Sequence, residues 1–172
     1  MHTAYLDLTE RVVATLRDQL PENMLYLPIH DDLSEKNILI DGGRIRLLCD
    51  WDSYRAKLFW EHVACTSVRF CTDRPLQGVL KQDKLTRFIT RLDPEVLASV
   101  PDTQLFAGLF PILATLKHLR TYRFRVTRVS DQRSELNQSL LEWPLEHCTW
   151  LLTNCDRVSS WIEEIFANKT PR

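Results

Sequence analysis

Two adjacent glycines, Gly42 and Gly43, lie between two short apolar runs and constrain the fold more than any other feature of the chain. The flanking runs are ILID at 38–41 and RIRLLC at 44–49, which are rich in β-favouring residues. Glycine readily adopts the positive φ angles of a two-residue hairpin turn. The pattern therefore predicts an antiparallel hairpin, and no other stretch of the sequence predicts one as clearly.

The rest of the sequence has apolar residues at the spacing of amphipathic helices. The first helix is expected to start near Asp7, because Asp7 and Glu10 resemble a capping box. A kink is expected where Pro111 interrupts a later apolar repeat. The expected helices span residues 7–20, 55–71, 80–92, 105–119 and 144–166. The predicted fold class is mainly α with a small β-hairpin, in a single domain covering 1–172.

Composition and charge argue against several classes of protein. The chain is 44% hydrophobic with a formal net charge of −1, so we expect it to fold and to have no general attraction for nucleic acid or an anionic membrane. No apolar stretch approaches the length of a membrane span, and the first residues lack the pattern of a signal peptide. The cysteines form no C-x-x-C pair, which predicts reduced core cysteines in a cytoplasmic protein. They are Cys49, Cys65, Cys71, Cys148 and Cys155.

Polar side chains stand at both ends of the predicted hairpin. A turn at the two glycines would place Asn37 opposite Leu48 and would bring Asp50 close to residue 35. The preceding loop can fold Asp32 toward the same place. One carboxamide and two carboxylates are therefore expected to converge.

Groups of this kind suit a hard cation and a hydroxyl substrate. Mg²⁺ is usually held by one or two protein oxygen ligands, while water and phosphate oxygens complete its shell. Asn37 and Asp50 have that chemistry. A carboxylate just outside the metal shell can accept the proton of an attacking hydroxyl in phosphoryl transfer, and Asp32 suits that role.

The segment from His30 to Asp52 resembles the catalytic segment of the aminoglycoside phosphotransferase and choline kinase families. It reads HDDLSEKN, then an apolar strand, a turn, a second strand and DWD. The family pattern is H-x-D-x-x-x-x-N, a hairpin and then Asp-(Trp or Phe)-(Asp or Glu). The preceding LPENMLYLPIH at 20–30 is also similar to the family, in which a short apolar strand enters the histidine. The resemblance is specific over residues 20–64 and only compositional afterwards.

The resemblance implies an ATP- and Mg²⁺-dependent phosphotransferase with a protein-kinase-like fold and a small-molecule hydroxyl substrate. It assigns the catalytic loop positions to Asp32, as the catalytic aspartate, and to His30, as a structural support of the loop. Asn37 and Asp50 would bind Mg²⁺ and the nucleotide. Asp52 would either bind a second metal ion or brace the loop.

The resemblance covers the C-terminal lobe of that fold alone. The catalytic loop and hairpin would occupy 28–54, and a helical subdomain would occupy 55–172. The sequence contains no G-x-G-x-x-G motif and no P-loop, and the residues before His30 read as one helix and a connector, so we expect the N-terminal lobe to be absent. A separate N-lobe partner or a homodimer would then have to complete the nucleotide site, and the isolated chain is expected to be inactive.

Two departures from the family pattern leave alternatives open. Asp31 stands where the family usually has glycine, and His62 stands where it has an aspartate that braces the loop. A non-catalytic, pseudokinase-like binding or scaffolding lobe is the main alternative. The stretch IRLLCDWDSY at 45–54 also fits the Asp-x-Asp motif of a haloacid-dehalogenase-type hydrolase, although that fold needs a parallel sheet. A merely solvated acidic hairpin end would explain the charges but not their spacing.

Later stretches carry weaker signals. Cations and aromatic residues interleave between Arg120 and Arg128, which is more typical of the solvated end of a helix than of a phosphate or base site. His118 and His147 have no partner at metal-ligand spacing and are interpreted as surface or core histidines. Trp143, Trp150 and Trp161 are interpreted as core residues or groove walls, one of which could line an acceptor pocket.

Overall fold

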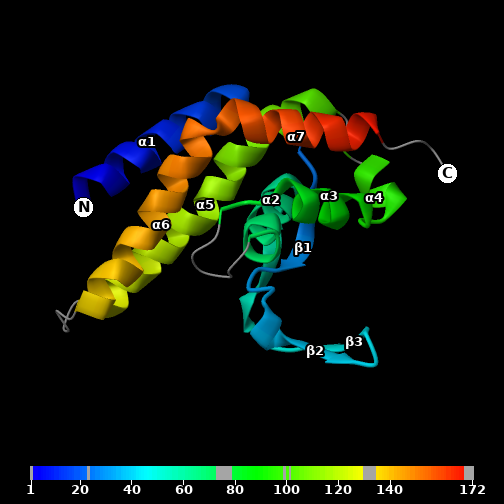
Figure 1. The fold of residues 1–172 in the computed structure, drawn as a ribbon, viewed down its shortest axis with the longest axis horizontal. Helices are drawn as coiled ribbons and strands as arrows, with labels where there is room; N and C mark the ends of the chain where they lie inside the picture. The colour runs from blue at the N-terminus through cyan, green and yellow to red at the C-terminus, as the bar shows by residue number, and fades with distance from the viewer. Residues whose placement is uncertain are drawn as a thin grey trace.

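A computed structural model describes residues 2–22, 24–72, 79–98, 100, 102–129 and 135–168 (Figure 1). The helices are α1 (His2–Gln19), α2 (Phe59–Phe70), α3 (Gln82–Thr90), α4 (Pro94–Ala98), α5 (Thr103–Val129), α6 (Glu135–Thr153) and α7 (Cys155–Ala167). The strands are β1 (Tyr26–His30), β2 (Ile38–Asp41), β3 (Arg44–Leu48) and β4 (Tyr54–Leu58), with short 3₁₀ turns η1 (Glu35–Asn37) and η2 (Trp51–Ser53). The expected fold class, mainly α with a small β-hairpin, is confirmed.

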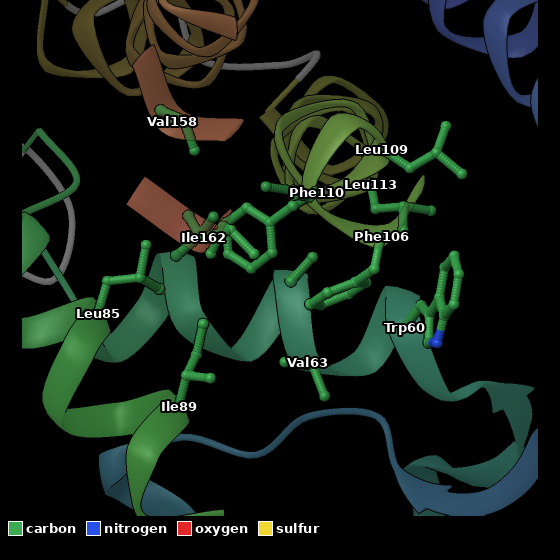
Figure 2. Packing of buried hydrophobic residues seen from close by; sticks show 14 of the residues in the cluster. Trp60, Val63, Leu85, Ile89, Phe106, Leu109, Phe110, Leu113, Val158 and Ile162 are labelled. Atoms are coloured by element: carbon green, nitrogen blue, oxygen red, sulfur yellow. The ribbon is translucent and has the colours of Figure 1, made fainter. Parts of the chain in front are cut away.

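Helix α5 is the centre of the helical body and packs against α1, α2, α6 and α7. Its first half carries apolar residues on all sides, which favours a helix surrounded by others. Phe106 and Phe110 are at most 2% exposed, and the Phe106 ring meets Trp60 of α2 with centroids 5.2 Å apart. Figure 2 shows these rings packed between α2, α3 and α7, where Leu85 and Ile162 close the cluster.

A second cluster joins α1 to the far half of α5 and to α6. Val12 is buried in it, and the Tyr5 ring stacks on Tyr122 with centroids 4.8 Å apart. Helix α1 begins at His2, so the expected start near Asp7 is wrong. The contact of Tyr5 with α5 explains the difference, because tertiary packing stabilises helical turns that propensity and capping alone do not specify.

The helices expected at 105–119 and 144–166 have different limits in the structure. Helix α5 continues to Val129 beside α6, with Pro111 inside it. Pro144 lies inside α6 instead of starting it, and the last helical region is two helices separated at Asn154. The backbone amide and the side-chain Nδ2 of Asn154 both donate to the Trp150 carbonyl at 2.9 Å, at the point where α6 ends and α7 begins.

Strand β4 occupies residues that were expected to begin a helix at Arg55. It pairs antiparallel with β1, with Tyr26 opposite Leu58 and His30 opposite Tyr54. Helix α2 therefore starts at Phe59, and β4 crosses the boundary expected between 54 and 55. The strand forms because β1, which lies far back in the sequence, offers a partner edge that no local pattern reveals.

The β2–β3 hairpin is present as predicted, with φ of 55° at Gly42 and 73° at Gly43. Its register differs from the expected one beyond the Ile40–Ile45 pair, because Arg46 is an extra residue that forms a bulge. Asn37 consequently lies opposite Cys49 instead of Leu48, and the Cys49 amide donates to the Asn37 carbonyl at 2.8 Å. The hairpin extends away from the helices (Figure 1).

All five cysteines are free thiols. Cys71 and Cys148 are buried, but Cys49 at the end of the hairpin is exposed, so the expectation of a core position is wrong for that residue. Among the residues that the structure describes, no helix combines the length and the apolar character needed to cross a membrane.

Candidate functional site

His30 connects the loop 30–37 to the end of the hairpin. Its Nε2 donates to the Cys49 carbonyl at 2.6 Å, and its ring meets Trp51 edge-on with centroids 4.9 Å apart. The Asp31 amide donates to the Ser53 carbonyl at 3.3 Å and adds a second link. His30 is 6% exposed, so it lies beneath the loop and has the position of a structural support.

Asp32 and Asn37 are brought together at the two ends of one tight loop. The Asn37 Nδ2 donates to the Asp32 carbonyl at 2.9 Å and lies 3.4 Å from the Asp32 Oδ2. The Asn37 amide also donates to the carbonyl of the buried Ser34 at 2.9 Å. Because the amide nitrogen of the Asn37 side chain is used inside the loop, its oxygen remains available as a ligand.

Asp50 has a backbone conformation that costs free energy. Its φ is 62° and its ψ is 55°, and it is the one non-glycine residue with positive φ in the described part of the chain. Aspartate tolerates this left-handed region better than most residues, yet such positions are retained mainly at functional sites. Its exposed carboxylate makes no hydrogen bond or ion pair within the described residues, and it follows Cys49, the residue paired with Asn37.

The residues expected to bind metal carry oxygen donors but do not gather into a cluster of carboxylates within the described ranges. No group of three His, Cys, Asp or Glu side chains gathers into a metal site within the described ranges, so Asp52, exposed in η2, does not complete a cluster with Asp32 and Asp50. Mg²⁺ does not require such a cluster, since one or two protein ligands suffice beside phosphate oxygens. The available oxygen of Asn37 and the unpaired carboxylate of Asp50 fit that donor set.

A pocket of about 490 Å³ opens beside Asp32, between the loop, β4, α2, α5 and α6. Its volume lies within the usual range for small-molecule sites. Asp32 lines it, whereas Asn37 and Asp50 do not. The candidate metal ligands therefore do not contribute to the surface of the pocket. Its lining includes the cations Arg55, Lys57, Arg69, Lys117 and Arg120.

One wall of the pocket is a closed network of ion pairs. Lys57 is 8% exposed and pairs with Asp31 and, at 3.0 Å, with Glu61. Arg55 also pairs with Asp31, at 3.2 Å, and Arg120 pairs with Glu61. Burial raises the pKa of Glu61, but the Arg120 and Lys57 cations outweigh that effect and hold the pKa below its usual range. The extra carboxylate at Asp31 is thus neutralised inside the fold.

Two further cations lie near Asp32 without close contact to it. Arg69 of α2 and Lys117 of α5 lie 3.9 Å and 4.0 Å from the same Asp32 Oδ1. Arg69 also donates to Glu35 at 3.2 Å. The Lys117 side chain is 27% exposed, and its ammonium makes no hydrogen bond within the described residues.

His62 lines the pocket at the position where the resemblance implies a bracing aspartate. Burial and then the nearby Lys57 cation lower the pKa of His62, so the ring is neutral at neutral pH. A neutral histidine has no negative charge, so His62 cannot replace an aspartate as an ionic partner. The ionic contacts here are those of Lys57 with Asp31 and Glu61.

Aromatic residues close the far end of the pocket. His118 is 2% exposed, and neither of its ring nitrogens has a hydrogen-bond partner in the described structure. Burial, with the neighbouring His147 and Lys117, lowers the pKa of His118 to about 3. Trp143 meets the His118 ring edge-on at 5.3 Å, and the Arg125 guanidinium lies over Trp143 at 5.3 Å.

Sequence reasoning proposed the loop residues and named His62, Arg120 and Trp143, but it did not predict the pocket that they share with the loop. His118 was interpreted only as a surface or core histidine, and the cations of β4 and α2 were not singled out. One signal was present, because Lys117, Thr121 and Phe124 recur at helical spacing and form one pocket-facing stripe of α5. The stripe alone does not predict a pocket, because the other walls come from α2 and the loop, whose positions the sequence does not give.

No protein-family model matches this chain, and no curated protein is significantly similar to it. Function is therefore inferred from residue chemistry and geometry.

Proposed function

We propose that the chain is the catalytic-loop lobe of an ATP- and Mg²⁺-dependent phosphotransferase that acts on a small-molecule hydroxyl, similar to the C-terminal lobe of aminoglycoside phosphotransferases and choline kinases. The observation that carries the proposal is the joining of the loop to the hairpin end. Asn37 contacts Asp32 through its side chain and Cys49 through its backbone, and Asp50 follows Cys49. The proposed catalytic aspartate therefore contacts one proposed metal ligand directly, and the second ligand follows the residue that is paired with the first.

Each residue has a role that follows from its chemistry. Asp32, at the mouth of the pocket, orients the acceptor hydroxyl and takes its proton as the oxygen attacks the γ-phosphorus of ATP. The bond from that phosphorus to the ADP oxygen breaks, and ADP leaves. Asn37 and Asp50 would hold Mg²⁺, which when bound offsets the negative charge of the phosphates. His30 supports the loop through the Cys49 carbonyl, and Asp52 either binds a second ion or braces the loop.

The exposed hairpin supports the expectation of a partner lobe. Ile40 and Ile45 are each 63% exposed, and Leu39 and Leu47 are more than half exposed. A two-stranded hairpin is only marginally stable by itself, and an apolar hairpin of this kind favours a covering surface. We propose that an N-lobe partner or a second copy of the chain covers it and closes over the nucleotide that Asn37 and Asp50 would hold through Mg²⁺.

A non-catalytic binding lobe is the second candidate, and the neutral His62 in place of a bracing aspartate favours it. A haloacid-dehalogenase-type hydrolase has no support, because the strands in the described ranges pair only antiparallel, as β1 with β4 and β2 with β3.

Titration calorimetry with MgATP tests the proposal. We expect the wild-type chain to bind MgATP and Asp50→Asn to lose at least about tenfold in affinity, since one charged ligand is removed. Asp32→Asn is expected to retain binding, because Asp32 acts on the acceptor. Asp41→Asn, a carboxylate at the other end of the same hairpin, is the matched control. Equal MgATP affinity in wild type and Asp50→Asn contradicts the metal assignment, and absence of any MgATP binding favours the non-catalytic lobe.

A further inference from the structure

The side of Asp32 on which the pocket lies determines what the pocket can hold. Asp32 lines the pocket, whereas Asn37 and Asp50, which on the proposed function would hold the nucleotide through Mg²⁺, do not. In a transfer reaction the acceptor must approach Asp32 from the side opposite the phosphates, because attacking and leaving oxygens lie in line. On the proposed function, on which this inference rests, the pocket is the acceptor site.

The charges around this pocket favour an anion. Five cations line it, and four carboxylates balance them, namely Asp31, Asp32, Glu35 and Glu61. The carboxylates other than Asp32 are each paired with at least one cation at 3.2 Å or closer. A positively charged acceptor would therefore find no free carboxylate except Asp32. The Trp143 face is no better for a cation, since Arg125 already lies over it.

Lys117 is the cation that most clearly lacks a close partner. Its side chain is 27% exposed, and its ammonium makes no hydrogen bond within the described residues and lies 4.0 Å from one Asp32 oxygen. A partly buried ammonium without an acceptor is unfavourable, and an added anionic oxygen would relieve that cost. Arg69 approaches the same oxygen from α2, so an anion between the two would contact two cations from different helices.

The far end of the pocket suits hydroxyl groups. The neutral His118 ring offers one donor and one acceptor, both without partners, and a hydroxyl can satisfy either. Neither nitrogen is exposed, so contact requires the ring or the adjoining Trp143 to rotate. Thr66 and Thr121 add neutral hydroxyls to the lining.

We infer that the acceptor of this pocket is a hydroxylated anion, such as a sugar acid or a sugar phosphate, whose carboxylate or phosphate is held by Lys117 and Arg69 beside Asp32. This inference names a substrate class with a charge opposite to that of an aminoglycoside or choline.

Binding of three sugars that share a ring but differ in charge tests the inference. D-Glucuronate, D-glucose and D-glucosamine are titrated into the full chain without nucleotide, and binding is followed by NMR shift changes of the pocket amides. We expect glucuronate to bind about tenfold more tightly than glucose, and glucosamine to bind most weakly. D-Glucose 6-phosphate in a fourth titration distinguishes phosphate from carboxylate recognition.

Charge-removing variants provide the matched comparison. Lys117→Gln is expected to weaken glucuronate binding about tenfold and to leave glucose binding unchanged. Arg17→Gln, which removes an exposed positive charge on α1, is expected to change neither. Equal binding of all three sugars, tightest binding of glucosamine, or no binding of either anionic sugar at millimolar concentration overturns the inference.

Adding MgATP separates this inference from the proposed function. Glucuronate that stays bound with MgATP present supports an acceptor site, whereas displacement by MgATP assigns the cations to nucleotide phosphate and overturns the inference. If glucuronate binds but MgATP does not, the anion pocket stands and the phosphotransferase proposal fails. If MgATP binds and no anionic sugar does, phosphotransfer stands and the acceptor class is wrong.

Discussion

In the helical body, Phe110 is 0% exposed on a helix that other helices cover, whereas in the hairpin Ile40 and Ile45 are 63% exposed. Both regions are rich in apolar residues. The body buries most of its apolar side chains between helices, whereas the hairpin extends away from the helices and leaves its apolar side chains exposed (Figure 1). The candidate site lies where the two regions meet. On one side of it the apolar side chains are buried in the helical body, and on the other side the apolar side chains of the hairpin are exposed.

The largest expected effect is in the body. Phe110→Ala should lower the free energy of unfolding by about 3–5 kcal/mol, because it removes a fully buried ring and leaves a cavity. Ile45→Ala in the hairpin, measured in the same urea titration, should cost less than about 1 kcal/mol. Comparable losses for the two variants would mean that the hairpin is buried in solution.

The next effect tests the ion-pair wall. Lys57→Met should destabilise the chain by about 3 kcal/mol, because it leaves Asp31 and Glu61 with less compensation near the core. Arg55→Met is the control, since this more exposed cation shares only Asp31 and should cost less than about 1 kcal/mol. A cost for Lys57→Met no larger than that of Arg55→Met would show that the wall is solvated.

Acid should destabilise the body through His118. Its pKa is about 3 in the folded chain against an ordinary value of 6.5, so the unfolded state binds the proton more readily between these values. Stability is therefore lost as the pH falls below 6.5, by about 2 kcal/mol between pH 6.5 and 5. His118→Phe removes this titration, and urea unfolding at both pH values should show a smaller loss in the variant. An unchanged loss assigns the pH dependence to other groups.

The positive φ of Asp50 at the end of the hairpin should lower the stability of the chain, while its carboxylate should contribute to MgATP binding. Asp50→Gly should stabilise the chain by up to about 1 kcal/mol, because glycine adopts the positive φ without strain. The same variant should bind MgATP no better than Asp50→Asn does. Destabilisation by glycine would show that the Asp50 side chain has a structural role that the described contacts do not include.

The smallest effect on stability, and the most direct test of the exposed hairpin, is on association. Light scattering at high protein concentration should show a mass above that of one chain, since apolar hairpin surfaces would pair. Ile40→Lys should lower that mass while changing unfolding free energy by less than about 0.5 kcal/mol. A single-chain mass for the wild type at every concentration counts against a homodimer and leaves a separate N-lobe as the partner.

Local patterns were sufficient for the hairpin and for the loop residues. Gly42 and Gly43 predicted the turn because their φ angles are a property of the residues themselves. The spacing of His30, Asp32 and Asn37 also predicted a common loop, although their roles in phosphotransfer stay a prediction. The register was wrong because Arg46 forms a bulge, and a bulge depends on contacts across the ladder that the count of residues does not contain.

The sequence by itself determined the helical class, the single clear hairpin and the group of polar residues at its ends, because these depend on backbone sterics and on contacts between near neighbours. Only the tertiary structure decided that β4 is a strand, that Asp31 is neutralised by Lys57, and that Lys117 faces Asp32. The physical reason is distance along the chain. Lys117 and Asp32 belong to separate elements that meet only after α2 and α5 have packed together. The free energy of that packing depends on residues far apart in the chain, so no short stretch of sequence predicts it.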